Sequence, residues 1–195
     1  VREQEIAGAV KMYVGQGPDW EQVAIGMVSS SYDDGFSFYQ GDRADLFSDV
    51  RMRKALTYCM DRQEIIRKFM YDMSSVPVTY VLPSSPLFAE GLEALPYDVD
   101  AGTSLLDEIG WKDLDGDPQT PRESVGVPNV GEGTALVLQF ATTEALLRQQ
   151  AAEQLTESMA ACGIQLEVTY YTPDEIYAPG PDGLLFGRNF DLAQL

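Results

Sequence analysis

The segment from residue 136 to residue 170 has the pattern of a strand, a long helix and a second strand. Apolar side chains alternate at Leu136, Leu138 and Phe140, and again between residues 164 and 170, as they do in half-buried strands. Between these runs, Thr143 is suited to cap a helix of about 20 residues and Gly163 to end it. A connection of this length joins parallel neighbours in one sheet. The pattern therefore predicts an α/β fold that includes a βαβ unit.

Capping residues predict three further helices upstream. Asp49 begins the first, Asp61 begins the second with capping-box spacing, and Asp98 begins the third, which Gly110 ends. Between the second and third helices, residues 74–97 contain several prolines, which favours an extended segment without regular structure.

The 195 residues are long enough for a single α/β lobe over residues 1–195, with residues 112–133 as an acidic Gly/Pro loop within it. Residues 189–195 have the alternation of a strand, and the sequence stops before that strand is complete. We therefore expect the chain to be an excised fragment of a larger protein.

Charge and side-chain chemistry exclude several classes of function. The chain has 13 Lys and Arg against 31 Asp and Glu, a net charge of −18, with no basic cluster to neutralise the phosphates of nucleic acid or of an anionic membrane. It contains no histidine, which leaves an enzyme only carboxylate, Lys, Tyr or Cys chemistry. It also lacks a nucleophile elbow and a phosphate-binding loop. A carboxylate-based hydrolase domain is therefore the weaker alternative to a binding module. We expect that the protein is not an enzyme.

Asp113, Asp115 and Asp117 are candidate calcium ligands. Three carboxylates at alternate positions resemble the start of a calcium-binding loop, in which oxygen atoms converge on the cation. An EF-hand loop also requires Gly at position six and Glu at position twelve, where this chain has Pro118 and Ser124. A calcium-binding structural module is thus a second alternative function. An acidic turn is the favoured interpretation, and no other cofactor is expected.

Cys59 and Cys162 both lie on apolar faces of predicted helices. One interpretation is two buried thiols that act as small apolar side chains. The other is a disulfide that joins the two helices, which requires an oxidising compartment. The sequence leaves both interpretations open.

Residues 29–45 are predicted to form a long polar loop that carries four aromatic side chains, Tyr32, Phe36, Phe38 and Tyr39. They either contact a ligand or partner or pack beneath the loop. Packing is favoured because aromatic side chains are usually buried.

The run FSDVRMRKALTYCMDRQEII at residues 47–66 resembles the signature D-V-R-V-R-x-A-L-x-Y-A-I-D-R-x-x-I of family 5 extracellular solute-binding proteins. Members of this family are the oligopeptide and dipeptide receptors of ABC importers. Further motifs follow in the family's order: YDVDA and LLDEIGW within residues 97–111, DLDGD at residues 113–117 and FDLA at residues 190–193. The resemblance covers roughly residues 20–195. It departs from the family pattern at Gly102-Thr103 and at both cysteines.

The resemblance implies a fold, a function and partners. The fold would be one lobe of a type II periplasmic-binding-protein-like clamshell, a mixed sheet with flanking helices. The function would be the capture of oligopeptides or similar small solutes between two lobes, as the substrate-binding component of an ABC importer. The expected partners are the second lobe of the same protein and the membrane permease of the ABC transporter, with no nucleic acid. The protein would be a monomer in an extracytoplasmic location, either periplasmic or a cell-surface lipoprotein.

The resemblance also implies one ligand-binding residue. The family's ligand-anchoring Trp and Asp follow the F/Y-D-x-x strand, after the position of Leu195. Gln194 lies where some peptide-binding members place a residue that faces the pocket. Gln194 is therefore the predicted ligand-binding residue of this chain.

Overall fold

A computed structural model of the chain describes residues 2–195 except 14, 16, 18, 27–45, 84, 118, 119, 129, 180–182 and 188. The aromatic loop predicted at residues 29–45 therefore lies outside the described residues.

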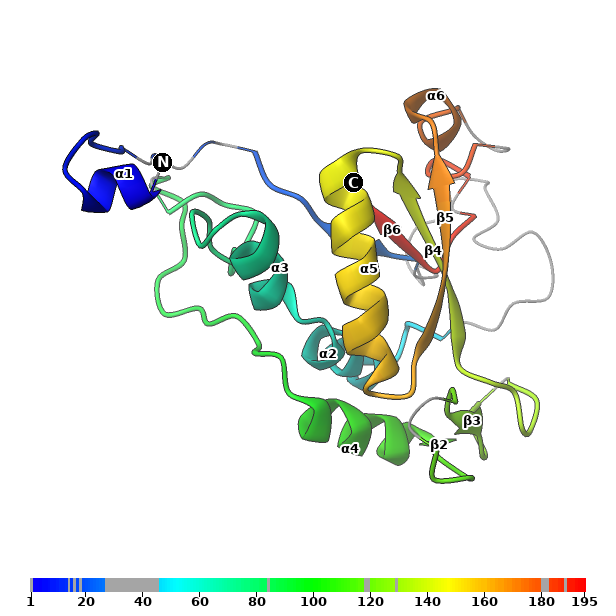
Figure 1. The fold of residues 1–195 in the computed structure, drawn as a ribbon. Coiled ribbons are helices and arrows are strands. Elements are labelled where there is room, and N and C mark those ends of the chain that lie inside the picture. The colour runs from blue at the N-terminus through cyan, green and yellow to red at the C-terminus, as the bar shows by residue number, and fades with distance from the viewer. Residues whose placement is uncertain are drawn as a thin grey trace.

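The predicted βαβ unit is present (Figure 1). β4 (Val137–Thr143) and β5 (Gln165–Tyr171) pair in parallel along their whole length, and α5 (Leu146–Ala160) connects them. The prediction that Thr143 caps the helix is wrong, because pairing with β5 keeps Thr143 in β4. Ala145 takes the N-cap position and makes no capping hydrogen bond through its side chain.

Two short strands complete the main sheet. Among the described residues the strand order is β1-β6-β4-β5, with β1 at Val23–Ile25 and β6 at Leu192–Gln194. β6 runs parallel to β4 and antiparallel to β1. The sheet is therefore mixed, as expected, and the strand predicted near the end of the sequence is present.

The three capping predictions upstream are confirmed. α2 (Val50–Cys59), α3 (Arg62–Phe69) and α4 (Val99–Ile109) are each preceded by an Asp whose carboxylate accepts a hydrogen bond from a backbone N–H of the first turn. Gly110 ends α4 with φ 115°, a left-handed conformation that favours glycine. A Cβ at this position would also approach the Val125 carbonyl oxygen to 2.5 Å.

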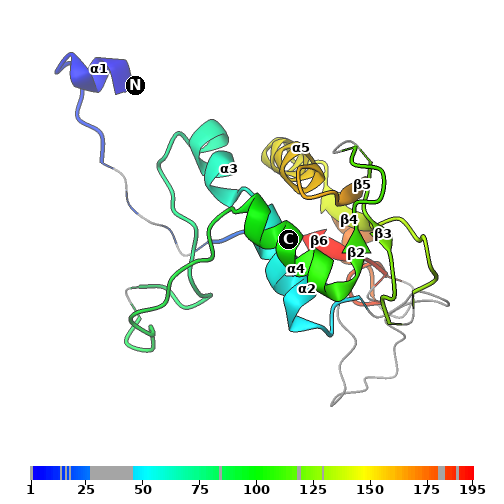
Figure 2. The same cartoon turned by 90° about the horizontal axis from the view of Figure 1, so that it is seen from below.

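Helices α2, α4 and α5 pack on one side of the sheet (Figures 1 and 2), and the main core lies between these helices and the strands. Fully buried residues of this core come from both layers: Leu56, Leu106, Leu138, Phe140, Met159 and Leu192. A smaller cluster on the other side of the sheet contains Ala141, Phe190 and Ala193. The short helix α6 (Pro173–Ile176) begins with a complete capping box between Thr172 and Glu175.

Cys59 and Cys162 form a disulfide with a Cα–Cα distance of 6.0 Å. It joins the end of α2 to the turn after α5, and both residues are buried. Gly102 of α4 lies directly against this bridge, because a Cβ built there would overlap the Cys59 sulfur and come within 3.2 Å of the Cys162 sulfur. The departures from the family pattern at Gly102 and at the two cysteines are therefore one structural feature.

The region predicted as an acidic loop at residues 112–133 contains part of a second, two-stranded sheet. β2 (Trp111–Lys112) and β3 (Glu123–Ser124) pair antiparallel. Arg122, which is 9% exposed, holds this sheet to the rest of the lobe. Its guanidinium group donates hydrogen bonds to the carbonyl oxygens of Trp111 and Cys162, at 2.9 and 3.0 Å, and to the Asp107 carboxylate at 2.9 Å.

Two segments lie away from the sheet. The N-terminal helix α1 (Arg2–Ile6) projects from the lobe (Figure 1), and residues 70–98 cross the surface without a helix or strand among their described residues, as the prolines predicted. The described helices include none that is both long and apolar enough to span a membrane.

Candidate ligand-binding pocket

Three strands bring polar residues to one edge of the main sheet. β4 and β6 are parallel, so Thr142, Thr143 and Gln194 come together where the two strands end. β1 is antiparallel to β6 and begins at the same edge, with Val23 opposite Gln194 and Glu21 just before it. In open α/β sheets, ligands bind outside the carboxyl ends of the parallel strands.

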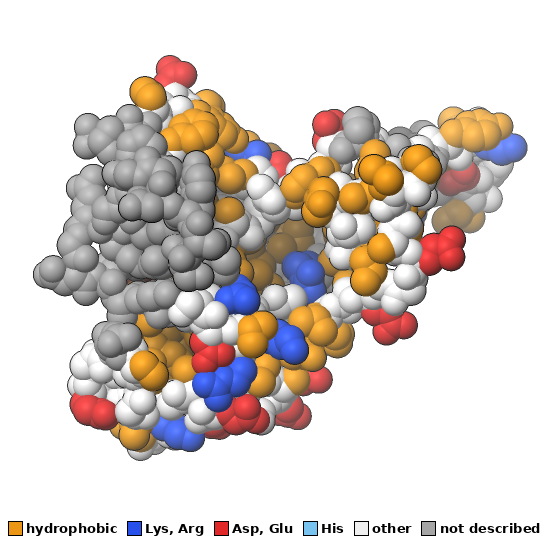
Figure 3. Space-filling view, turned by 180° about the vertical axis from the view of Figure 1, so that it is seen from behind, with side chains coloured by type: hydrophobic (Ala, Val, Ile, Leu, Met, Phe, Trp, Pro, Cys, Tyr) orange, Lys and Arg blue, Asp and Glu red, His pale blue; other side chains and the backbone are white. Residues whose placement is uncertain are grey.

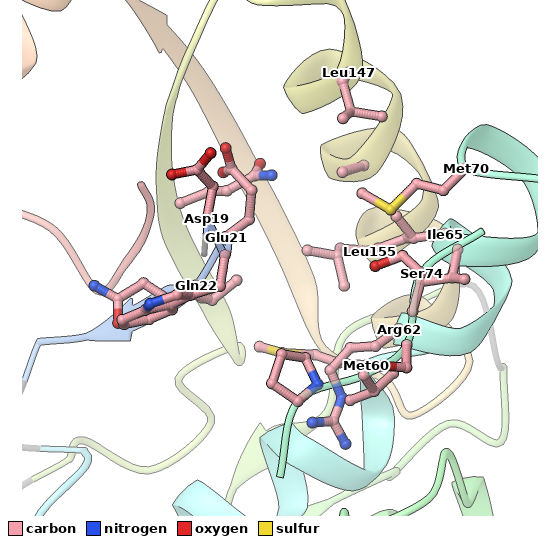
Figure 4. A pocket seen from close by; sticks show the side chains of 18 of the residues that line it. Asp19, Glu21, Gln22, Met60, Arg62, Ile65, Met70, Ser74, Leu147 and Leu155 are labelled. Atoms are coloured by element: carbon pink, nitrogen blue, oxygen red, sulfur yellow. The ribbon is translucent and has the colours of Figure 1, made fainter. Parts of the chain in front are cut away.

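A pocket of about 710 Å³ opens beside this edge. Residues 19–23 and Gln194 form one wall, and α3, one side of α5 and the extended segment 74–80 form the other (Figure 4). Seen from behind, the molecule is hollowed, and hydrophobic side chains gather along the hollow (Figure 3). The volume falls within the range of about 300–1,000 Å³ that is typical of small-molecule sites.

Gln194, the predicted ligand-binding residue, lies in the wall of this pocket. Its side chain is 6% exposed, and its amide oxygen accepts a hydrogen bond from the Thr142 hydroxyl at 3.2 Å. This bond fixes the orientation of the amide group, which is what a binding residue needs. Contact between Gln194 and a ligand remains a prediction.

Arg148 and Glu21 form an ion pair that links α5 to the segment before β1. The Arg148 guanidinium donates to the Glu21 carboxylate at 3.1–3.3 Å and to the Thr143 hydroxyl at 3.1 Å. The pair therefore connects α5 and the end of β4 to Glu21, which lies two residues before β1 and lines the pocket. Sequence analysis missed it because 127 positions separate Arg148 from Glu21 and neither belongs to a local motif.

The other wall is mainly apolar. Ile65, Met70 and Leu155 face the pocket, together with Leu147, which is 38% exposed (Figure 4). Leu147 and Leu155 both belong to α5 and line the same wall of the pocket. Leu147 remains partly exposed because the pocket in front of it is not filled by other residues of the described chain.

Asp113, Asp115 and Asp117 lie far from the pocket in an exposed turn. Asp113 accepts a hydrogen bond from the Gly116 N–H at 2.7 Å, and Asp115 accepts from the Asp117 N–H at 2.9 Å and the Thr120 hydroxyl at 3.0 Å. The Asp117 N–H and the Thr120 hydroxyl hold the pKa of Asp115 below its usual value. Within the described part of the chain, no group of three or more His, Cys, Asp or Glu residues is arranged to hold a metal ion.

The acidic turn remains the favoured interpretation and a calcium site the alternative, and calorimetric titration distinguishes them. Because the Asp113 and Asp115 carboxylates already accept hydrogen bonds within the turn, we expect calcium affinity no tighter than millimolar. Asp115→Ala should leave the titration unchanged. Micromolar binding that Asp115→Ala abolishes would instead make the turn a calcium site.

The chain matches known proteins over most of its length. The sequence profile of the bacterial extracellular solute-binding proteins, family 5 Middle, matches residues 7–194. The nickel-binding periplasmic protein of Escherichia coli (strain K12) is 28% identical over 148 residues, which are 73% of this chain and 26% of that relative.

Solved structures share the fold at low sequence identity. An oligopeptide-binding protein from Thermus thermophilus, complexed with a pentapeptide, gives a TM-score of 0.65 at 18% identity and covers 76% of this chain and 24% of its own. An ABC transporter substrate-binding protein from Sinorhizobium meliloti gives 0.66 at 20% identity and covers 100% of this chain and 32% of its own. The chain thus spans about a quarter to a third of the length of these proteins.

Proposed function

The chain belongs to the bacterial extracellular solute-binding proteins of family 5, and we propose that it is part of one lobe of a substrate-binding component of an ABC importer. It would capture oligopeptides or similar small solutes between this lobe and a second lobe of the same protein. Capture would be non-covalent, by closure of the two lobes about a hinge, and would break no bond in the solute.

One observation carries this proposal. The pocket lies at the carboxyl ends of β4 and β6, and Gln194 is held in its wall by Thr142. Its walls combine apolar side chains with a few oriented polar groups, which is the composition expected of a site for a small molecule.

The partners and the compartment are proposed from membership of the family. The solute-loaded protein would deliver its solute to the membrane permease of the transporter. It would act as a monomer outside the cytoplasm, either in the periplasm or as a cell-surface lipoprotein. The disulfide between Cys59 and Cys162 supports an extracytoplasmic location, because disulfides persist mainly in oxidising compartments.

Ligand affinity of the isolated chain tests the two-lobe mechanism. Because each lobe supplies about half of the contacts, the 195-residue chain alone should bind short peptides only at millimolar concentrations. Isothermal titration with a mixed set of short peptides measures this. Micromolar affinity in the isolated chain would contradict capture between two lobes.

Gln194→Ala tests the pocket itself. In the two-lobed protein, this change should weaken binding of the co-purifying solute about tenfold, because it removes an oriented amide from the site. Gln165→Ala is the matched control, since Gln165 is exposed at the opposite end of the sheet. Equal affinities for the two variants would show that Gln194 has no part in binding.

A further inference from the structure

Arg62, the first residue of α3, is the one basic residue among the described residues that line the pocket. Its side chain is half-buried and extends from α3 along the pocket beside Met60 (Figure 4). The pocket lining on the same wall includes the apolar residues Met60, Ile65 and Pro77, and the carboxylates Asp19 and Glu21 belong to the opposite wall. A cation therefore lies on the more apolar wall of the cavity.

The charge of Arg62 is not balanced by a carboxylate within the described chain. Several basic residues there form ion pairs with Asp or Glu: Arg51, Arg67, Lys68, Lys112, Arg122 and Arg148. None of these ion pairs includes Arg62, although acidic residues outnumber basic ones by 31 to 13. Its nearest acidic neighbour in sequence, Asp61, uses its carboxylate to cap α3.

The hydrogen bonding of Arg62 is also incomplete. Nη2 donates to the Leu95 carbonyl oxygen, and a guanidinium group has five N–H donors. Burial lowers the pKa of Arg62, and no neighbouring carboxylate of the described chain opposes that effect. A half-buried cation with spare donors at a cavity of about 710 Å³ is suited to bind an anion, and a planar guanidinium group matches a carboxylate best.

We propose that Arg62 binds a carboxylate group of the ligand, while the apolar part of that ligand lies against Ile65 and Leu155. This inference rests on the proposed function, because it assigns a role to a residue of the same pocket. The ligand class is an apolar carboxylate. Its carboxylate is either the C-terminus of a short peptide or the acid group of a non-peptide solute.

Chemical-shift titration of the 195-residue chain tests this assignment at the millimolar affinities expected for it. The probes are trileucine with a free carboxylate, trileucine amide and octanoate. The readouts are the Arg62 Nε–H resonance and the backbone amides of residues 19–23 and 147–155. We expect the free acid to bind at least about tenfold more tightly than the amide, because only the acid can form the charge-assisted bond.

Three variants make the result specific to Arg62. Arg62→Gln should abolish the preference for the free acid, and Arg62→Lys should restore part of it, since it keeps the charge. Arg67→Gln is the matched control, because Arg67 lies on the same helix but is exposed and outside the pocket. An unchanged backbone spectrum shows that each variant is folded.

The remaining outcomes separate this inference from the proposed function. If the acid and the amide shift the pocket amides with equal affinity, or if Arg62→Gln keeps the preference, the assignment of Arg62 is wrong and the pocket remains a binding site. If none of the probes shifts the pocket amides at high millimolar concentration, both the assignment and the role of the pocket are wrong. Arg62-dependent binding of octanoate as tight as that of trileucine supports a non-peptide acid, and weaker binding of octanoate supports a peptide.

Discussion

Removal of the disulfide by the double change Cys59→Ala and Cys162→Ala is expected to lower the free energy of unfolding by about 3–5 kcal/mol. The bridge closes a loop of 103 residues, and its loss frees the unfolded chain over that whole length. Both cysteines are buried, so the change also removes two sulfur atoms from the core. Equilibrium denaturation in urea measures the difference, and a loss below about 1 kcal/mol would mean that the bridge contributes little.

Gly102 provides an independent check on the same feature. In the disulfide-bonded protein, Gly102→Ala should cost about 1–3 kcal/mol, because its Cβ would overlap the Cys59 sulfur. With both cysteines changed to Ala, the same substitution should cost little or stabilise by up to about 1 kcal/mol, since Ala favours helix over Gly. An equal cost in both backgrounds would show that Gly102 and the bridge are not coupled.

Arg122→Ala is the second change with a large expected effect, a loss of about 3 kcal/mol. The side chain is 9% exposed and donates to two carbonyl oxygens, those of Trp111 and Cys162, which would lose their partner. Its ion pair with Asp107 adds less, because Asp107 is 47% exposed and water screens the pair. Urea denaturation measures the loss.

Lys112→Ala is the matched control for Arg122. Lys112 also pairs with Asp107, at 3.6 Å, but its side chain is 40% exposed, against 10% for that of Arg122. We expect a change within about 0.5 kcal/mol. Equal losses of stability in the two variants would show that the buried hydrogen bonds of Arg122 do not hold the sheet of β2 and β3 in place.

Local patterns predicted the elements of this fold because each depends on neighbouring residues. The carboxylates of Asp49, Asp61 and Asp98 cap helices within three residues of themselves, and the alternation of Leu138 and Phe140 is complete within one strand. The start of α5 was misplaced because Thr143 has a partner in β5, Tyr171, that its own neighbourhood does not reveal.

Features that join distant parts of the chain could not be predicted in this way. Whether Cys59 and Cys162 are thiols or a disulfide depends on how closely the end of α2 and the turn after α5 approach, and Gly102 of α4 leaves room for the bridge. Gln194 was predicted from a family resemblance, whereas Arg62 carried no signal of binding. Arg62 is half-buried and has no carboxylate partner among the described residues, and both features depend on the packing of α3 beside the pocket.

Hydrogen exchange of the two-lobed protein, with and without its co-purifying solute, tests the central claim most directly. That claim is that the edge of the sheet where β4 and β6 end, with the pocket beside it, holds the solute. The account predicts slower exchange on binding at residues 19–23, at residues 147–155 and at Gln194. Protection confined to other parts of the lobe, with these three segments unchanged, would contradict it.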